Sequence, residues 1–338
     1  MFQVLITDYL APPPTIEQRL LSGLAKVECL EAKAAKELAG RADAADALIV
    51  FHEVTLPRAI IERLTRCRVI VRCGTGYDQI DLSAAAERGV PVCNVPDYGV
   101  DEVADHAIAL MLACNRRLLQ AERGLRQTLA PWNYHAVQTI FRLSGATLGI
   151  IGLGRIGTAT AMRAKGLKMR VVACDPYLRS GLDKAVGVTL VDLNTLLAES
   201  DVISLHVPLT DETRNMIDGV ALGKMKPHAI LLNTSRGAVV DTGALAAALE
   251  QGRIGGAGID VLPTEPPDGS EPLVKMWRQA CERPVNLVLT PHTAFYSEAG
   301  LVEMREKAAQ EVARVLSGEA PRNCVNEHLL KAGVVVGR

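Results

Sequence analysis

Four side chains suited to acid–base or anion-binding chemistry follow short apolar segments in the second half of the chain: Arg236, Asp260, Glu265 and His292. The apolar segments have the length and composition of buried β-strands. In open α/β sheets, ligands bind beyond the carboxyl ends of the strands, so side chains at the strand ends meet at one edge. We therefore expect these four side chains to lie close together.

Each of the four residues also has an ordinary structural interpretation, because an isolated arginine is usually solvated and an isolated histidine is usually packed and hydrogen-bonded. Together they match hydride transfer to a 2-keto acid. Arg236 can bind the substrate carboxylate through two parallel hydrogen bonds. His292 can protonate the new alcohol oxygen near neutral pH, and Glu265 can orient that imidazole and favour its charged form. Asp260 is expected either to hydrogen-bond the nicotinamide end of a cofactor or to cap a turn.

A glycine-rich loop closes one apolar segment and opens a predicted helix, with the sequence Gly152-Leu153-Gly154-Arg155-Ile156-Gly157. In this context the pattern is typical of dinucleotide binding. Gly152 permits a tight turn, Gly154 lets the backbone approach a pyrophosphate, and Gly157 lets helix and strand pack closely. The helix N-terminus then offers N–H groups to the phosphates. An ordinary strand-to-helix turn is the alternative interpretation.

Asp175 ends the next apolar segment, 18 residues after Gly157 (175 − 157). An acidic side chain at this point can accept hydrogen bonds from the ribose hydroxyls, and it repels a 2′-phosphate. The sequence therefore favours NAD over NADP as the cofactor. Arg179 follows closely and weakens that preference.

The elements that must position these residues alternate between short apolar segments and helical segments. This pattern predicts an α/β protein with doubly wound parallel sheets. In the first third we expect strands at residues 4–6, 47–50 and 69–71 and a helix at 15–24. In the second series we expect strands at 147–151, 170–174, 202–205, 230–232, 258–261 and 287–289, and helices at 156–166, 193–199, 219–225, 243–250 and 297–316.

Two intermediate segments carry more specific expectations. Residues 101–123 read as one long helix with Asp101 as its N-cap. Residues 263–284 are rich in proline and charge, and we expect an irregular surface excursion there.

The chain has 338 residues with a net charge of −1 and 49% hydrophobic residues, so it has room for one large or two ordinary domains. It lacks a basic block, which argues against a nucleic-acid partner or a basic membrane face. The longest apolar run, residues 107–114, is too short to span a bilayer, and the N-terminus lacks signal-peptide features. The eight cysteines contain no C-x-x-C pair, which predicts buried free thiols in a reducing, cytoplasmic compartment.

Several further motifs occur with these features over most of the chain. Their combination resembles the D-2-hydroxyacid dehydrogenases, and within that family the C-terminal-binding-protein branch is the most similar. The motifs that carry the resemblance lie at residues 71–81, 92–96, 152–157, 175–178, 233–237, 260–266, 290–298 and 323–326.

The resemblance implies a Rossmann cofactor domain, residues 101–292, inserted into a discontinuous, flavodoxin-like substrate domain made of residues 1–100 and 293–338. It implies an active site between the two domains, with Arg236, Glu265 and His292 as the catalytic set and no metal. The family is usually a homodimer paired through its cofactor domains, so residues 128–142 would be an arm that reaches over the partner.

The resemblance also implies two sets of binding residues. Phe295 stands where the binding-protein branch has tryptophan, so that branch's substrate preference does not transfer, and we expect Phe295 to face the substrate side chain. The substrate set is His52, Arg72, Thr75, Gly76, Arg236 and Phe295. The predicted NAD contacts are Thr75, Gly152, Gly154, Arg155, Ile156, Gly157, Asp175, His206, Pro208, Thr213, Thr234, Ser235, Arg236, Asp260 and His292.

The predicted function is the reversible, NADH-dependent reduction of a 2-keto acid to a D-2-hydroxy acid. Two alternatives stay open. One is an NAD(H)-sensing dimeric binding protein of the corepressor type. The other is a dehydrogenase of a phosphorylated 2-hydroxy acid such as 3-phosphoglycerate, for which Arg72 would be the phosphate ligand.

Overall fold

The computed structural model describes residues 1–130, 132–137, 140–279 and 285–330. The chain divides into two compact units: unit 1 is Met1–Gly99 with Ser297–Arg338, and unit 2 is Val100–Tyr296. The domain boundaries expected from the sequence lie one residue and four residues from these limits (100 against 99, and 293 against 297). Each unit is built around a parallel sheet, which confirms the predicted fold class.

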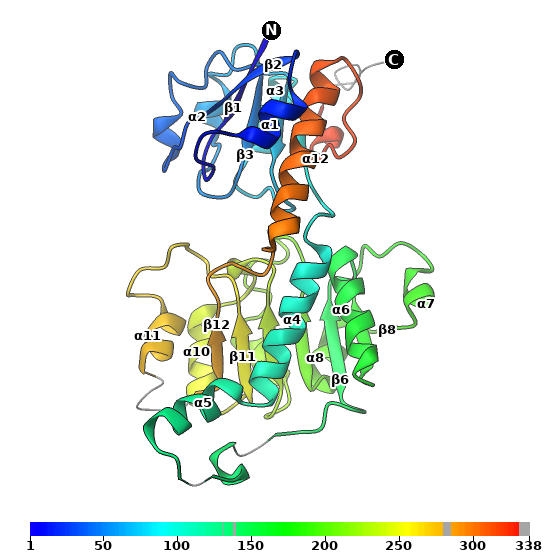
Figure 1. Cartoon of the computed structure of the whole chain (residues 1–338). Coiled ribbons are helices and arrows are strands. Elements are labelled where there is room, and N and C mark those ends of the chain that lie inside the picture. Colours follow the sequence, from blue (N-terminus) through cyan, green and yellow to red (C-terminus); the bar gives the residue numbers. More distant parts are fainter. Residues whose placement is uncertain (131, 138–139, 280–284, 331–338) are drawn as a thin grey trace. The chain divides into compact units, whose positions relative to one another are not determined.

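Unit 1 contains a five-stranded parallel sheet in the order β2-β1-β3-β4-β5, the flavodoxin-like order. Helices α1 and α12 pack side by side on one face of the sheet (Figure 1). The apolar residues of α2 and α3 pack against the other face. The strands are β1 Phe2–Ile6, β2 Ala25–Cys29, β3 Ala47–Val50, β4 Val69–Arg72 and β5 Val92–Asn94, and the helices are α1 Thr15–Leu20, α2 Arg58–Ile61, α3 Leu82–Glu87 and α12 Glu298–Leu316.

The two ends of the chain meet in unit 1 through a buried ion pair. Glu17 of α1 is fully buried, and both its carboxylate oxygens accept hydrogen bonds from Arg305 of α12 at 2.7 Å. The two-pronged geometry satisfies both carboxylate oxygens, so the burial of this charge is compensated. Strands β3 and β4 are buried along their whole length, as expected for a parallel sheet covered on both faces.

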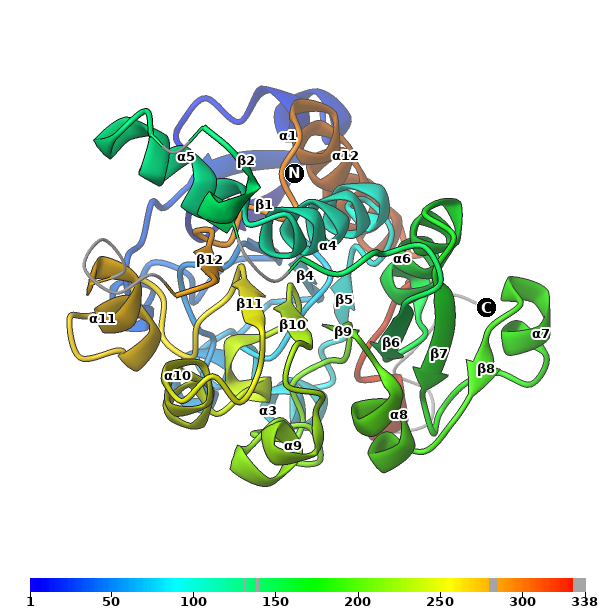
Figure 2. The ribbon, with the colours of Figure 1, turned by 90° about the horizontal axis from the view of Figure 1, so that it is seen from below.

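Unit 2 contains a seven-stranded parallel sheet in the order β12-β11-β10-β9-β6-β7-β8, the Rossmann order with an added strand. Helices α4 and α6 lie on one face, and α8, α9 and α10 lie on the other (Figure 2). The strands are β6 Thr147–Ile151, β7 Arg170–Cys174, β8 Thr189–Leu190, β9 Val202–Leu205, β10 Ile230–Asn233, β11 Gly256–Ile259 and β12 Leu287–Leu289, and the helices are α4 Val100–Asn115, α5 Leu118–Gln127, α6 Arg155–Gly166, α7 Leu182–Val186, α8 Leu193–Glu199, α9 Gly219–Lys224, α10 Thr242–Glu250 and α11 Pro272–Gln279.

Helix starts in unit 2 are fixed by aspartates. Asp192, Asp218 and Asp241 each accept a hydrogen bond from the backbone N–H three residues on, at the N-caps of α8, α9 and α10. On the other face, α4 approaches β11 so closely that a Cβ at Gly258 would lie 2.9 Å from Cβ of Leu110. The glycine in β11 therefore sets the depth at which α4 packs on the sheet.

Two predictions about intermediate segments are wrong. The expected helix over residues 101–123 is two helices, α4 and α5, because the chain breaks at Arg117, which has the left-handed φ of 50°. Asp101 therefore lies inside α4 and is not its N-cap. The segment 263–284 is not wholly irregular, since it contains α11, whose Leu273 and Val274 are buried. Residues 280–284, including Cys281, lie outside the described part of the chain.

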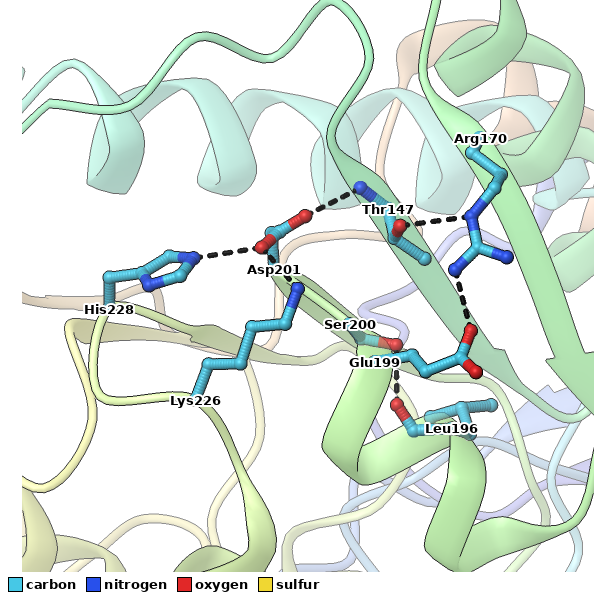
Figure 3. Close-up of polar contacts among 8 residues, drawn as sticks. All are labelled: Thr147, Arg170, Leu196, Glu199, Ser200, Asp201, Lys226 and His228. Carbon is cyan, nitrogen blue, oxygen red and sulfur yellow. Dashed lines mark hydrogen bonds and ion pairs between the residues drawn. The ribbon is translucent and has the colours of Figure 1, made fainter.

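A polar cluster joins the amino-terminal ends of β6, β9 and β10, opposite the strand ends where the predicted site lies (Figure 3). Asp201 accepts hydrogen bonds from the backbone N–H of Thr147 at 2.7 Å, from Lys226 Nζ at 2.7 Å and from His228 Nε2 at 2.8 Å. Burial raises the pKa of Asp201, but these hydrogen bonds and the Lys226 charge outweigh it and hold that pKa below its usual value. This cluster aligns strand starts and is structural.

Every cysteine in the described part of the chain is free, and Cys73, Cys93 and Cys114 are buried. Across the same residues, no helix combines the length and the apolar character needed to cross a membrane. A search of those residues also finds no group of three histidine, cysteine or acidic side chains placed to hold a metal ion.

Candidate active site

His292 and Glu265 meet where β11 and β12 end. His292 Nδ1 lies 2.6 Å from Glu265 Oε2, and Glu265 Oε1 accepts a hydrogen bond of 2.8 Å from the backbone N–H of Leu262. The two side chains are 28% and 33% exposed, so a small molecule can reach them. His292 has a left-handed φ of 53°, which is uncommon for a residue other than glycine and is a form of strain found at functional sites.

The charge of Glu265 is set by opposing effects. Burial raises the pKa of Glu265, but the hydrogen bond and charge of His292, the N–H of Leu262 and the charge of Arg236 together bring that pKa below its usual value. Glu265 is therefore a carboxylate at neutral pH. A carboxylate that faces Nδ1 fixes the tautomer of the imidazole and favours its protonated form.

The turn after β10 presents Arg236. Asn233 holds this turn, since its Nδ2 donates to the carbonyl of Arg236 at 2.9 Å while its Oδ1 accepts from Ser235 N at 3.0 Å and Ser235 Oγ at 2.8 Å. A Cβ at Gly237 would lie 1.9 Å from the carbonyl carbon of Leu262, so the turn packs directly on the backbone that leads to Glu265. Arg236, Glu265 and His292 are thus brought together, and the positioning role of Asn233 was not foreseen.

Asp260 is buried at the end of β11 and organises the turn that carries His292. Its carboxylate accepts hydrogen bonds from Thr290 Oγ1 at 2.6 Å and from the backbone N–H groups of Thr293 and Ala294, each at 3.0 Å. Turn capping, one of its two expected roles, is what these bonds provide. The contact with a nicotinamide remains a prediction.

His106 of α4 extends this network and was missed in the sequence. Its Nε2 lies 3.0 Å from Thr290 Oγ1 and 3.6 Å from Asp260 Oδ1. The only signal was a polar ring directly before the apolar run 107–114, and the pairing spans 184 residues of sequence. Phe295 also lies near, with its ring edge-on to His292 at a centroid distance of 5.9 Å and an interplanar angle of 86°.

The glycine loop runs from the end of β6 into α6, as predicted. Gly152 has a φ of 92°, and a Cβ there would lie 2.6 Å from the carbonyl oxygen of His206. A Cβ at Gly157 would lie 2.1 Å from the carbonyl oxygen of Gly152, whereas one at Gly154 would meet nothing within 4 Å. The loop therefore packs tightly against its neighbours at Gly152 and Gly157 but leaves open space at Gly154. A dinucleotide pyrophosphate fits such a loop.

Asp175 follows β7, the strand beside β6, and touches the glycine loop. Its Oδ2 accepts from the backbone N–H of Leu153 at 2.9 Å, and its Oδ1 accepts from the N–H of Tyr177 at 2.9 Å. Both contacts fix the carboxylate at the carboxyl edge of the sheet. This is the place from which an acidic side chain can reach a ribose.

The other predicted cofactor residues differ in their hydrogen bonding. Thr234 is buried after β10, and its Oγ1 has no hydrogen-bond partner among the residues that the structure describes. Such an orphaned hydroxyl at a strand end fits a bound ligand. Thr213 Oγ1 instead donates to the carbonyl of Pro208 at 2.6 Å and shapes that loop. His206 contacts Ser204 Oγ at 2.8 Å, and burial lowers the pKa of His206 to about 4, so it is neutral at pH 7.

The residues predicted to bind substrate from unit 1 follow β3 and β4. Arg72 Nη1 donates to the carbonyl of Cys73 at 2.6 Å, and a Cβ at Gly74 would lie 1.4 Å from that nitrogen, so the guanidinium folds over its own loop. Asn94 Nδ2 donates to the carbonyl of Thr75 at 2.6 Å. The loop 73–76 is therefore held from both sides, by Arg72 and by β5.

His52 is exposed after β3 and lies beside Tyr9, at a ring-centroid distance of 4.7 Å. Asp8 fixes the same loop, since its carboxylate accepts from the backbone N–H groups of Phe51 at 2.9 Å and Glu53 at 2.7 Å. Tyr9 and Asp8 were not foreseen. Their signal was a pair of polar residues directly after the first strand.

Comparison with known proteins places this geometry in a family. Residues 108–294 match the model of the D-isomer specific 2-hydroxyacid dehydrogenase NAD-binding domain. This chain belongs to the D-isomer-specific 2-hydroxyacid dehydrogenases. A glyoxylate reductase of Korarchaeum cryptofilum is 40% identical over 287 residues, which cover 85% of this chain and 84% of that protein. A glyoxylate reductase of Thermococcus litoralis is 40% identical over 291 residues, which cover 84% of this chain and 85% of that protein.

A solved structure extends the likeness to both units of this dehydrogenase. The D-lactate dehydrogenase from Aquifex aeolicus, complexed with NAD and lactic acid, is 30% identical, has a TM-score of 0.83, and covers 93% of this chain and 95% of that chain. The predicted activity and cofactor are confirmed: the chain is an NAD-dependent D-2-hydroxyacid dehydrogenase. The binding-protein alternative is not favoured.

The carboxyl edge of this dehydrogenase fits NAD(H) by its own structure. The open cradle at Gly154, the fixed carboxylate of Asp175 and the orphaned hydroxyl of Thr234 all lie at strand ends of unit 2. NADH supplies the hydride when it is bound. The chain's own residues supply the proton, the anion-binding group and the fixed geometry.

Proposed function

We propose that this D-2-hydroxyacid dehydrogenase acts on glyoxylate, with Arg236, Glu265 and His292 as its catalytic set. The observation that carries the catalytic roles is the 2.6 Å contact between His292 Nδ1 and Glu265 Oε2, beside the turn that holds Arg236. The substrate choice is supported by the two curated relatives, which are glyoxylate reductases. A small 2-keto acid also suits a site whose histidine is flanked by the ring of Phe295.

The roles follow from the geometry. Since Nδ1 of His292 faces Glu265, Nε2 is the nitrogen that gives its proton to the keto oxygen as this becomes an alcohol. Arg236 binds the substrate carboxylate and polarises the keto group. Glu265 holds the imidazole in place and stabilises its positive charge before the proton leaves. In the oxidation direction, the same nitrogen takes the proton back.

The catalytic assignment is tested with His292→Gln. We expect kcat for glyoxylate reduction to fall about 10²–10⁴-fold while the Kd for NADH stays within a few-fold of the wild type. His328→Gln, at an exposed histidine of unit 1, is the matched control and should keep full activity. Near-normal turnover by His292→Gln with intact NADH binding would show that another group gives the proton.

The substrate proposal is tested with a panel of 2-keto acids. Glyoxylate, hydroxypyruvate, pyruvate, a branched 2-keto acid and a phosphorylated 2-keto acid are compared by kcat/KM, each with NADH and NADPH. We expect glyoxylate to have the highest kcat/KM. We expect NADH to be preferred to NADPH, because Asp175 repels a 2′-phosphate. A clear preference for the phosphorylated acid would favour the 3-phosphoglycerate alternative and a phosphate-binding role for Arg72.

Membership of the C-terminal-binding-protein branch stays a prediction, and the same wild-type measurements address it. Substrate binding by His52, Arg72, Thr75 and Gly76 also stays a prediction. A protein of the binding type would turn over none of the panel while NADH changed its assembly state. Turnover of glyoxylate would leave the branch without functional support.

We further propose that the protein is a homodimer through α5 and the segment that follows it. A run of large apolar side chains is exposed there, and exposed apolar clusters mark interaction sites. The described members of this run are Leu118, Leu119, Leu125, Leu129, Trp132 and Tyr134.

The dimer is tested by sedimentation at micromolar concentration. We expect a dimer for the wild type and a monomer for the double variant Leu129→Asp/Trp132→Asp. Val220→Asp, at an exposed valine of α9, places one such charge elsewhere and should remain dimeric. A wild-type monomer, or a double variant that stays dimeric, would contradict the assignment.

A further inference from the structure

Two cysteines from distant parts of the chain face each other in unit 1. Cys93 lies in β5, and Cys324 lies in the segment after α12; the two form an isolated antiparallel bridge. The flanking hydrogen bonds run from Asn94 N to the carbonyl of Asn323 at 3.2 Å and from Val325 N to the carbonyl of Val92 at 2.8 Å. The cysteines are therefore directly opposite each other as a non-hydrogen-bonded pair.

This type of pair has the backbone spacing that a disulfide needs. Directly opposite residues of a non-hydrogen-bonded antiparallel pair have Cα atoms about 4.5 Å apart, with side chains on the same face. Disulfides usually span Cα distances of about 4.4–6.8 Å. In this structure both thiols are free, and Cys324 Sγ donates to Asn326 Oδ1 at 3.3 Å. The backbone already holds the two cysteines opposite each other.

The two thiols differ in reactivity. The neighbouring Cys324 side chain and burial raise the pKa of the Cys93 thiol, and the charge of Glu311 adds to this. The Cys93 side chain lowers the pKa of Cys324, against burial and the charge of Glu327. Cys324 is also the more exposed of the two. Because the thiolate is the reactive form, Cys324 is the attacking group and Cys93 is the resolving group.

A cavity of about 570 Å³ borders the pair within unit 1. Asn94 and Asn323, the neighbours of the two cysteines, both line it. Its wall carries both signs of charge, from Asp97, Glu311 and Glu319 and from Lys307, Arg314 and Arg322. The cavity offers a small zwitterionic disulfide a place beside the bridge, although neither cysteine lines it.

We propose that Cys93 and Cys324 form a reversible disulfide by exchange with a low-molecular-weight disulfide, RSSR. The Cys324 thiolate attacks one sulfur of RSSR, which forms a mixed disulfide and releases RS⁻. Cys93 then loses its proton and attacks Sγ of Cys324, which forms the Cys93–Cys324 bond and releases the second RS⁻. Two protein thiols are oxidised by two electrons, and RSSR is reduced to two RSH that take up the two protons.

The cross-link has a thermodynamic consequence. It would tie β5 to the C-terminal segment and close a loop over residues 94–323, so it restricts the unfolded chain strongly. It also fixes the strand end from which Asn94 holds the loop at Thr75. We expect oxidation to raise the apparent Tm by roughly 5 °C or more. The proposal does not depend on which 2-keto acid the enzyme uses.

The test uses the full-length native protein and glutathione disulfide as the probe. After incubation, remaining thiols are blocked with N-ethylmaleimide, and peptides are mapped by mass spectrometry before and after dithiothreitol. We expect a dithiothreitol-sensitive peptide that joins Cys93 to Cys324, together with the rise in Tm. Cys324→Ser should abolish both, whereas Cys29→Ser, which removes a half-buried thiol of β2, should abolish neither.

The proposal fails if glutathione disulfide oxidises other thiols of the protein while Cys93 and Cys324 both remain free and are blocked by N-ethylmaleimide. It also fails if Cys324 stops at the mixed disulfide with glutathione, since then Cys93 does not resolve it. The mapping of the wild-type protein needs no substitution, so a folding defect in a variant cannot mask either outcome.

Discussion

At the residue scale, Glu265 keeps its negative charge although it is only 33% exposed, because His292, Arg236 and the N–H of Leu262 all stabilise the carboxylate. Glu265→Gln keeps the size and removes the charge. We expect kcat for reduction to fall about 10²-fold. We also expect the variant to lose the acid limb of the wild-type pH profile, because the amide cannot be protonated as Glu265 is when the pH falls through its lowered pKa.

The pH profile of kcat/KM for glyoxylate reduction measures both effects. Glu28→Gln, at an exposed carboxylate of β2, is the matched control and should reproduce the wild-type profile. A uniformly lower profile with an unchanged acid limb would mean that the charge of Glu265 is not used.

A second prediction at the residue scale concerns Thr234, where one substitution should raise stability and weaken NADH binding. Its buried hydroxyl has no partner within the described part of the chain, so Thr234→Val should raise the free energy of unfolding without ligand by about 1 kcal/mol. If the hydroxyl bonds the cofactor, the same change should weaken NADH binding about tenfold. Denaturant unfolding and NADH titration measure the two quantities.

Thr160 provides the matched control, since its Oγ1 in α6 is also buried without a partner. Thr160→Val should stabilise the protein and leave the Kd for NADH unchanged. Equal Kd values for Thr234→Val and the wild type would remove Thr234 from the cofactor site.

Single residues also show how far sequence reasoning reaches into the site. Arg236, Glu265 and His292 were identifiable because each follows an apolar segment and a parallel sheet gathers such positions at one edge. The partners that fix them were not identifiable. Asp260 bonds Thr290, and Thr290 contacts His106 across 184 residues, and no local pattern reports such a pairing.

At the scale of elements, the turn between β6 and α6 assigns separate roles to its glycines. A Cβ at Gly157 would meet the carbonyl oxygen of Gly152 at 2.1 Å, so Gly157→Ala forces the backbone apart and should lower the free energy of unfolding by about 2 kcal/mol. A Cβ at Gly154 meets nothing within 4 Å, so Gly154→Ala should leave the Tm unchanged. It should still weaken NADH binding at least about tenfold, because the methyl group occupies the place of the pyrophosphate.

Each of these two glycine variants therefore controls for the other, with thermal melting and NADH titration as the measurements. Normal NADH binding by Gly154→Ala would mean that the phosphates lie elsewhere on the loop.

Two of the elements missed in the sequence share a physical cause, which is that packing overrides local signals. The break between α4 and α5 falls at Arg117, where neither glycine nor proline marks a helix end. Helix α11 forms in a proline-rich segment because Leu273 and Val274 pack on the core of unit 2. Strand β2 has an alternating buried and exposed pattern that a period-two search would have found.

At the scale of the whole molecule, the fold class was predictable because the alternation of apolar and helical segments is a global pattern that tolerates local errors. Strand order was available only through the family resemblance, since no local sequence signal states which strands are neighbours. The sheet orders of the two units, flavodoxin-like and Rossmann, agree with that resemblance.

The stability of the whole molecule should depend on pH through His206. Burial lowers the pKa of His206 from 6.5 to about 4, so the folded protein holds this ring neutral while the unfolded chain protonates it below pH 6.5. The corresponding stability is fully present above pH 6.5 and is lost as the pH falls from 6.5 towards 4, by an amount on the order of 3 kcal/mol. The carboxylates of Asp201 and Glu265, whose pKa values lie below their usual ones, add a second loss at lower pH.

His206→Gln isolates the first of these windows, because the amide can still bond Ser204 Oγ but does not titrate. Between pH 6.5 and 4, we expect the free energy of unfolding of the variant to fall less than that of the wild type. Below pH 4, the two free energies should fall with the same slope. Denaturant unfolding at half-unit pH steps measures the difference, and His228→Gln, at an exposed ring that bonds Asp201, is the comparison. Parallel curves for His206→Gln and the wild type across this window would show that His206 is protonated in the folded protein.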